Sequence, residues 1–349
     1  MKNLLKKIVP ESVWGTLRNR QKSQMQARTL ANNYDYDRLR FERYASPNRN
    51  FLSNGNRVAY LVMLYHSLEK GMSMPEPKYG YGKAKANELL DQIEECIQLE
   101  CDKSQVLAAV SVLEAYNEFN TAQDITSPDL TKRLAQIKHL LQDENRSDVR
   151  PVGGGKRLIQ SATIEEAREV NFRSFAFSRH SVRNFTDKEV STKIIEEAVA
   201  IAQKSPSVCN RQSSKVHVYD NNTLGQQLLE IQGGNNGFGH TANKILVVTS
   251  DLSSFLSPGE RNQCWIDGGL FAMTLIYALH SLGVSTCCLN WSKELEVDER
   301  FRLCSDIPRQ ENVIMLIVAG YTPKEFYVPY SHRVPVAEIL TLHKTSHED

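Results

Sequence analysis

The pattern of apolar and polar positions gives the front of the chain a helical character. Between residues 85 and 142, the segments KANELLDQIEECIQLE and SQVLAAVSVLEAYNEF repeat apolar residues every three or four positions, as amphipathic helices do. Before them, RVAYLVMLYHSLEKGMSMP predicts a buried helix that ends at Gly71 and Pro75. Since few strand-like stretches occur before residue 160, we expect this part to be mainly helical.

The segment NRSDVRPVGGGKR, residues 145–157, is predicted to be a linker because it contains a proline and three consecutive glycines. It also resembles a phosphate-binding loop. However, Lys156 is followed by Arg157 where that loop has Ser or Thr, and Arg150 stands at the place of its first glycine. The linker interpretation is therefore the one we keep.

Beyond the linker the pattern alternates between helix and strand. TIEEAREVNFRSFAF and STKIIEEAVAIAQK predict helices, the second with Ser191 as N-cap and an end before Pro206. KVHVYD, KILVVTSD, VSTCCLNW and NVIMLIVAGY are strand-like, and CWIDGGLFAMTLIYALHSLG, apolar on most sides, predicts a central helix. This order favours an α+β sheet domain of two or three layers over residues 161–349, behind a mainly helical region over residues 1–160.

Composition and charge exclude several classes of protein. The chain has 349 residues, 41% of them hydrophobic, with 42 Lys and Arg against 41 Asp and Glu, a formal net charge of +1. That balance argues against an extended nucleic-acid surface, which usually carries a strong basic excess. No apolar run reaches the length of about 18 residues that a membrane span needs. The basic N-terminus MKNLLKKIVPESVWGTL interrupts its apolar runs too often to form a signal-peptide core.

The seven cysteines have irregular spacings and form no CxxC pair, so we predict neither a zinc site nor a thioredoxin-like couple. Cys287 and Cys288 lie in an apolar run and are interpreted as small buried hydrophobic residues. A reducing cytoplasm is the compartment that fits this usage of cysteine.

The stretch FSRHSVRNF is the first candidate for chemistry. It places Arg179, His180 and Arg183 within five residues, with the hydroxyl of Ser181 between them. Such a cluster is either a solvated polar turn or a site for a phosphate and a second anion.

A second candidate is SPSVCNRQSSKVHV. Pro206 and Ser207 favour a turn, while Asn210 and Gln212 offer amide groups that both donate and accept hydrogen bonds. Amides suit the edge of a heterocycle with alternating carbonyls and ring nitrogens. An Asx-type turn that leads into a strand would use the same residues.

Two further segments complete the set. GVSTCCLNW ends a predicted buried strand with Leu289, Asn290 and Trp291. The ends of strands often border clefts. YVPYSHRVPVAEIL carries Arg333, which is either solvated or a ligand-binding residue.

The order of these pieces resembles the FMN-dependent nitroreductase family. R-H-S-x-R-x-F is followed by a helix, S-P-S-x-x-N-x-Q, an apolar helix with DGG, G-V-S-x-x-x-L-N-W, VAGY and a late arginine, over roughly residues 166–340. The resemblance implies an α+β sandwich with a central, mostly antiparallel sheet flanked by helices. It also implies a homodimer with FMN at the subunit interface, reduced by NADH or NADPH.

The same resemblance implies roles for the basic residues. Arg179 and Arg333 would bind the FMN phosphate, and Ser181 would contact the ribityl chain or the pyrimidine edge. Arg183 would face the flavin N1–O2 edge, where a cation raises the reduction potential by stabilising the reduced anion. His180 would contact the cofactor directly or support a residue that does.

The remaining matches concern the flavin ring. Pro206, Ser207 and Asn210, with Gln212 in the same motif, match a stretch that in the family reaches the flavin of the partner subunit. Leu289 and Asn290 match the segment whose backbone lies against N5, the atom that takes and gives hydride. Asn235, in the glycine-rich GGNNGFGH, is a weaker match, since this loop is also typical of a surface turn.

Two features depart from the family pattern. Trp291 stands where many relatives have a small residue, so it could cover the flavin face. The first 160 residues have no counterpart in minimal nitroreductases. Within them, His66, Glu69 and Lys70 of HSLEKGMSMP could extend over the flavin and select a substrate, or could simply end a helix capped by Gly71.

Three hypotheses follow. The first is an enzyme in which FMN takes hydride from NADH or NADPH and passes two electrons, in ping-pong order, to a small molecule. It needs no dedicated acid–base side chain, because protons can come from water. The second is a non-catalytic flavin-binding sensor or interaction protein, and the third is a dimer scaffold that has lost FMN. No nucleic-acid or membrane partner is expected.

Overall fold

The computed structural model describes residues 11–46, 51–74, 76–142, 153–158, 170–329, 333 and 335–343. The linker predicted over 145–157 therefore lies partly outside the described residues, as does the predicted domain boundary at residue 160. The front of the chain is helical, as predicted. Its elements are α2 (Glu11–Tyr44), α3 (Asn54–Met72), α4 (Lys83–Gln98), α5 (Lys103–Thr121) and α6 (Pro128–Gln142).

Helices α3 to α6 pack around one apolar core. The predicted apolar stripes meet there, with Leu68 of α3, Leu90 of α4 and Leu113 of α5 all without exposed surface. Side-chain caps fix where two of the helices begin. Ser53 accepts a hydrogen bond from an amide of the first turn of α3, and Asp102 does the same for α5.

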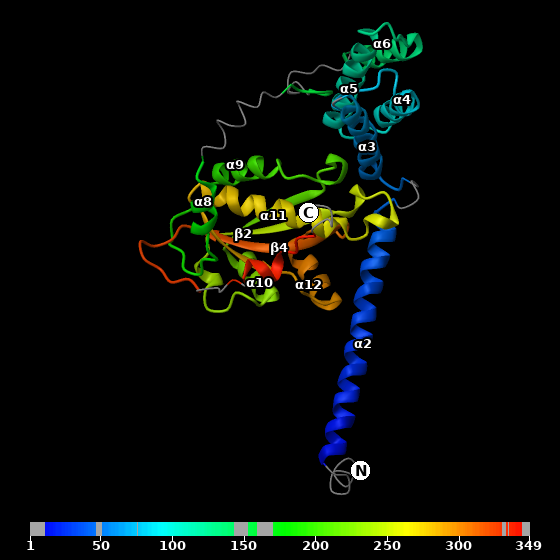
Figure 1. Cartoon of the computed structure of the whole chain (residues 1–349). Coiled ribbons are helices and arrows are strands. Elements are labelled where there is room, and N and C mark those ends of the chain that lie inside the picture. Colours follow the sequence, from blue (N-terminus) through cyan, green and yellow to red (C-terminus); the bar gives the residue numbers. More distant parts are fainter. Residues whose placement is uncertain are drawn as a thin grey trace, which may run out of the picture.

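The long helix α2 is unlike the other helices, because it is polar on nearly all sides and much of it projects away from both packed bodies (Figure 1). Its C-terminal part is held by tertiary contacts. Tyr36 donates a hydrogen bond to Asp298 at 2.8 Å, and Arg40 donates to the carbonyl oxygens of Arg309 and Glu311.

The glycine-rich end of the predicted linker is packed against the helical core. A Cβ atom on Gly154 would lie 2.6 Å from a methyl group of Val112 and 2.7 Å from the Val112 backbone nitrogen, so only glycine permits this approach. Gly155 donates its backbone N–H to Glu69 at 3.2 Å. Gly154 and Gly155 thus allow this segment to pack closely against α5 and α3.

The second half of the chain forms a sheet with helices on both faces. The strands are β1 (Ser214–Asp220), β2 (Lys244–Asp251), β3 (Ser285–Asn290) and β4 (Glu311–Gly320), in the order β1-β2-β4-β3. All three pairings are antiparallel, and a bulge interrupts the β2–β4 register between Val248 and Thr249.

Strand alternation divides the core of this domain into two layers. Leu246 and Ile317 face one side of the sheet, while Val247 and Leu316 face the other. The first side is covered by α9 (Thr192–Ala202) and α11 (Gln263–Ser281), and the second by α10 (Thr223–Gln232) and α12 (Leu295–Ser305), which gives three layers (Figure 1).

The remaining elements are short. They are α8 (Phe172–Ser178), α13 (Val336–Ile339) and the 3-10 turns η1 (Val208–Asn210), η2 (Gly239–Thr241), η3 (Leu252–Ser254) and η4 (Pro258–Glu260). The predicted α+β fold, with an antiparallel sheet flanked by helices behind a mainly helical region, is confirmed. Within the described ranges, no helix combines the length and the apolar character that crossing a bilayer requires.

One detail of the prediction was wrong, and a second feature was not foreseen. Cys288 is exposed, whereas its neighbour Cys287 is buried, because successive residues of β3 point to opposite faces of the sheet. Helix α11 is not covered all round by its own chain. Ile266 is 54% exposed, Leu270 44% and Met273 37%, so one side of this apolar helix faces outward.

Candidate functional site

The basic cluster of FSRHSVRNF lies beside the edge strand β3. Ser181 forms a parallel bridge with Thr286, and the Val182 N–H donates to the Thr286 carbonyl at 2.9 Å. Val182 and Phe185 are buried, which fixes this extended segment in place. Arg183, between them, is consequently exposed.

The guanidinium groups of the cluster have no acidic partner within the described residues. Arg183 donates to the Ser181 carbonyl at 3.3 Å, and its guanidinium lies 5.6 Å from the ring centre of Phe238. Arg179 is partly buried at the end of α8, and His180 is exposed. The positive charges of Arg179 and Arg183 therefore remain available to an anion.

A histidine that the sequence analysis did not single out joins this cluster. His280, near the end of α11, has its Nε2 atom 2.8 Å from the hydroxyl oxygen of Ser178. Burial, and then the charge of Arg179, lower the pKa of His280. His280 lies about a hundred residues beyond Arg179 in the sequence, so no local motif could have revealed it.

The second candidate motif forms a tight loop after α9. Three of its residues have positive φ although none is glycine: Cys209 at 48°, Asn210 at 55° and Gln212 at 51°. Such backbone strain is often found at functional sites. The Gln212 N–H donates to the hydroxyl of Ser207 at 3.0 Å, which holds the loop closed.

This loop borders two cavities. One, of about 70 Å³, is lined by Pro206, Ser207 and Gln212. The other, of about 360 Å³, lies between the loop and the helical region, where Asn210 and Gln212 face residues of α3 and Gln105 of α5. The amide groups predicted to meet a heterocycle thus border open space, and the helical region supplies part of its wall.

The two motifs lie at opposite ends of α11 (Figure 1). The loop is tied to the N-terminal half of this helix, since the Val208 N–H donates to buried Asp267 at 3.1 Å. The basic cluster touches the other end through His280. His280 lies thirteen positions after Asp267 along the helix, a distance of about 20 Å. A single chain therefore does not bring the two motifs together.

The other predicted residues have different environments. Leu289 is buried in β3, while Asn290 is exposed and donates to Ser292 at 2.8 Å. Asn235 closes its own loop: its side chain donates to the Leu229 carbonyl, and its carbonyl accepts from Gly239. Arg333 is exposed, and its nearest neighbours in sequence lie outside the described residues.

Trp291 is held against α12. Its indole N–H donates to Asp298 at 2.9 Å, and its ring packs on Phe301 with 4.4 Å between the ring centres. Contacts with α12 of its own domain therefore hold this indole in position.

Two residues of the motif HSLEKG, His66 and Glu69, make their hydrogen bonds within the helical region. The His66 ring lies 3.2 Å from a carboxylate oxygen of Glu69, and the other oxygen of Glu69 accepts the Gly155 N–H. Both residues lie in the last two turns of α3. The opposite end of α3 contacts the sheet domain, where Asn56 donates to the carbonyl of Ser253. Within one chain, HSLEKG is thus remote from the basic cluster.

A comparison with family models finds a match in the second domain. Residues 176–233 match the model of the nitroreductase family, and this stretch contains both the basic cluster and the strained loop. This segment of the chain is therefore similar to the nitroreductase family. We refer to residues 170–343 as the nitroreductase-like domain. No curated protein matches the chain.

Several solved structures are similar to half of the chain. A nitroreductase family protein from Streptococcus pneumoniae TIGR4 is 22% identical over 50% of this chain and 100% of its own, with a TM-score of 0.43. An FMN-dependent nitroreductase from Clostridium difficile R20291 is 22% identical over 45% and 91%, with a TM-score of 0.38. A nitroreductase-like protein from Streptococcus mutans is 18% identical over 50% and 98%, with a TM-score of 0.44.

Proposed function

We propose that the protein is an FMN-dependent NAD(P)H oxidoreductase that works as a homodimer and passes two electrons to a small-molecule acceptor. The observation that carries this proposal is the separation of the two motifs along α11. Each chain has a basic cluster at one end of the helix and an amide-bearing loop at the other. Between them lies an exposed apolar surface made of Ile266, Leu270 and Met273.

A two-fold dimer joins the separated halves. In such a dimer the same surface of both copies is in contact. If the two-fold axis is perpendicular to α11, two α11 helices packed through their apolar sides run antiparallel. The N-terminal half of one helix then lies beside the C-terminal half of the other. This arrangement brings the loop of one chain, with Asn210, to the basic cluster of its partner and makes two equivalent sites.

The donor groups of the cluster suit the phosphate of FMN. Because no described carboxylate neutralises Arg179, its planar guanidinium can bind two phosphate oxygens at once. Arg333 would add a second cation to this phosphate site, and His180 is close enough in sequence to support it. The Ser181 hydroxyl would bind the ribityl chain or the pyrimidine edge.

Arg183 has the second charged role. Bound FMN supplies hydride chemistry at N5, and its N1–O2 edge gains negative charge on reduction. The Arg183 guanidinium, fixed beside β3 and stacked near Phe238, would stabilise that charge. The backbone at Leu289 and Asn290 would line the N5 side, and the loop residues Pro206, Ser207, Asn210 and Gln212 of the other chain would cover the ring edge.

Anaerobic titration of the purified protein tests the proposal. We expect a yellow dimer whose flavin absorption band disappears on addition of NADH or NADPH and returns when an electron acceptor is added. Flavin that is bound but reduced by neither nucleotide would support a sensor instead. Protein that stays colourless after addition of FMN would show that only the scaffold remains.

A further inference from the structure

A cavity that the cofactor assignment does not use lies between α2 and the nitroreductase-like domain. Its volume is about 270 Å³, and its wall includes Tyr36 and Arg40 of α2, Asp298 and Arg302 of α12, and Asn312 at the start of β4. Trp265 and Trp291 provide aromatic surface. Charged groups of both signs, Asp37, Lys293 and Glu294, also line it.

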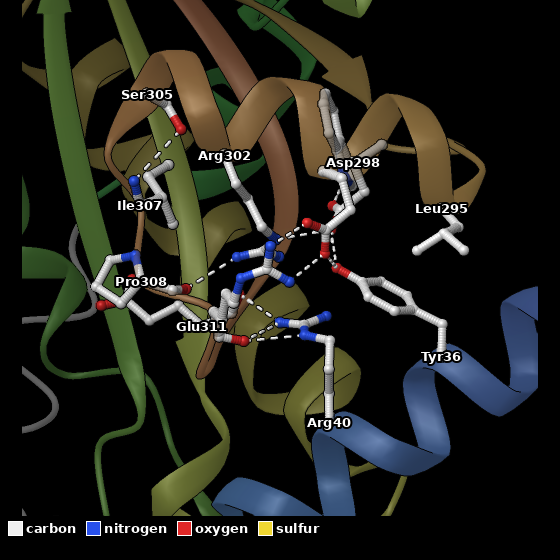
Figure 2. Close-up of polar contacts among 12 residues, drawn as sticks. Tyr36, Arg40, Leu295, Asp298, Arg302, Ser305, Ile307, Pro308 and Glu311 are labelled. Atoms are coloured by element: carbon white, nitrogen blue, oxygen red, sulfur yellow. Dashed lines mark hydrogen bonds and ion pairs between the residues drawn. The ribbon is translucent and has the colours of Figure 1, made fainter.

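One hydrogen-bond donor of the Arg302 side chain has no acceptor among the described residues. Its side chain is almost fully buried, and the residue is only 5% exposed. Nε donates to Asp298 at 2.7 Å and Nη1 to the Pro308 carbonyl at 2.9 Å (Figure 2). Within the described part of the chain, Nη2 is buried and has no acceptor. A buried guanidinium N–H of this kind strongly favours an added oxygen atom.

A second buried guanidinium lies beside the first. Arg40 donates to the Arg309 carbonyl at 2.9 and 2.6 Å and to the Glu311 carbonyl at 2.8 Å, but to no carboxylate among the described residues (Figure 2). Burial, and then the charge of Arg302, lower the pKa of Arg40. Asp298 accepts from Arg302, Tyr36 and Trp291, and it receives no hydrogen bond from Arg40.

The Asn312 side chain lacks a hydrogen-bond donor to its oxygen atom among the described residues. The residue is 7% exposed, and its Nδ2 donates to the sulfur of Cys264 at 3.4 Å. Its Oδ1 is buried and accepts no hydrogen bond from any described residue. The wall of one cavity thus combines a donor and an acceptor that lack partners among the described residues with two neighbouring guanidinium groups. Asp298 pairs with Arg302, and Asp37 also lines the cavity.

We propose that this cavity binds a small carboxylate that carries a neighbouring hydroxyl or ammonium group, that is, an α-hydroxy or α-amino acid. A carboxylate oxygen accepts from Arg302 Nη2 and offsets the charges of both arginines, and the neighbouring donor satisfies Asn312 Oδ1. The volume lies just below the range of about 300–1,000 Å³ that is typical of drug-sized ligands, so the ligand is of metabolite size. Because α2 and α12 share the cavity, the bound acid links the helical half to the nitroreductase-like domain.

Calorimetric titration of the full-length protein tests this with four probes: L-lactate, L-alanine, acetate and L-lactamide. Acetate lacks the neighbouring donor, and lactamide lacks the charge. We expect one saturable site per chain for L-lactate or L-alanine, with affinity at least about tenfold higher than for the other two probes. The tighter of the two acids identifies the donor as hydroxyl or ammonium.

Two variants locate the site. Asn312→Leu removes Oδ1 at similar volume, and we expect at least about a tenfold loss for the tighter acid with acetate binding unchanged. Arg302→Lys keeps the charge but removes Nη2, and it should weaken all carboxylates. Asn32→Leu, at an exposed position of α2, is the control. If Arg302→Lys does not fold, Asn312→Leu decides alone. Absence of saturable binding at millimolar concentrations, or affinities unchanged in these variants, would overturn the proposal.

Discussion

The helical core and the nitroreductase-like domain differ in how their basic residues are paired and in which apolar side chains are exposed. In the helical core, basic residues pair with acids of neighbouring helices: Arg57 with Glu95, and Arg133 with Asp91 and Glu94. In the nitroreductase-like domain, by contrast, the cluster around Arg179 has no described acidic partner, and α11 leaves an apolar side exposed. The first region pairs these basic residues within its own helices, whereas in our proposal the second receives an anion and another protein surface.

The largest expected effect comes from the exposed side of α11. In the double variant Leu270→Asp, Met273→Asp, two carboxylates would have to be buried in an apolar interface, which is strongly unfavourable. We expect the dimer to dissociate at concentrations about 100-fold above those at which the wild type does, and FMN to be lost with it. Light scattering coupled to size exclusion measures the change.

Leu303→Asp is the control for this experiment. Leu303 is 82% exposed on α12, away from the α11 surface, so its replacement should leave the dimer intact. A double α11 variant that remains dimeric and yellow would show that the exposed side of α11 is not the dimer interface.

The next effect concerns the unpaired charge. Arg179→Ala removes a charge-assisted contact to the FMN phosphate, worth about 1.5–3 kcal/mol, so the dissociation constant should rise about 10- to 150-fold. Fluorescence titration of apoprotein with FMN measures it. Arg173→Ala, at an exposed position of α8, should have little effect. Equal affinity in the Arg179 variant and the wild type would refute the phosphate assignment.

Arg183→Ala should act on the potential more than on binding. Loss of one cation beside the reduced flavin lowers its two-electron potential by about 30–60 mV, if the contact is worth about 1.5–3 kcal/mol. Equilibration with a reference dye measures this shift. A potential equal to that of the wild type would count against placing Arg183 at the N1–O2 edge.

Much of the fold could be predicted because it follows from local patterns. Ser191 caps α9, as its position before an amphipathic segment predicts, and its side chain accepts from the Ile194 N–H. The four strands correspond to the four strand-like segments. Two short helices, α10 and α12, were not predicted, because each has only a few apolar positions and lies between stronger signals.

The site was predictable only in part, because its geometry depends on contacts between residues far apart in sequence. Motif order pointed to both halves of the site, but it could not show that α11 holds them about 20 Å apart within one chain. His280 reaches the basic cluster from the end of a helix that the sequence analysis treated as core. The unsatisfied atoms of Arg302 and Asn312 become visible only when α2 has been placed against α12 and β4.

A smaller effect tests the closed packing of the helical core. Gly154→Ala would place a methyl group within 3 Å of the backbone of α5, and relieving such a clash typically costs about 1–3 kcal/mol. Chemical denaturation should show this loss of stability. Gly153→Ala is the matched control, since its Cβ would meet no atom within 4 Å. Equal losses in the two variants would mean that chain flexibility, rather than close packing, sets the effect.

The smallest expected effect is a pH dependence inside the nitroreductase-like domain, at a place where that domain does pair its charges. Buried Glu311 lies 2.7 Å from the His217 ring and accepts from Thr249. Burial raises the pKa of Glu311, but these hydrogen bonds and the charge of His217 outweigh it, so the pKa is lowered overall. The unfolded chain therefore takes up this proton at a higher pH than the folded chain does.

Stability from Glu311 is thus fully present above the unfolded pKa of about 4.3 and is lost as the pH falls through the lower folded value. Glu311→Gln removes this titration, so the free energy of unfolding should fall less steeply below about pH 4.5 in the variant than in the wild type. Denaturation at a series of pH values compares the two slopes, with Glu296→Gln on the exposed side of α12 as control. Parallel curves would mean that the Glu311 carboxylate has the same pKa in the folded and the unfolded chain. The contacts with His217 and Thr249 would then not stabilise the charged carboxylate in this domain.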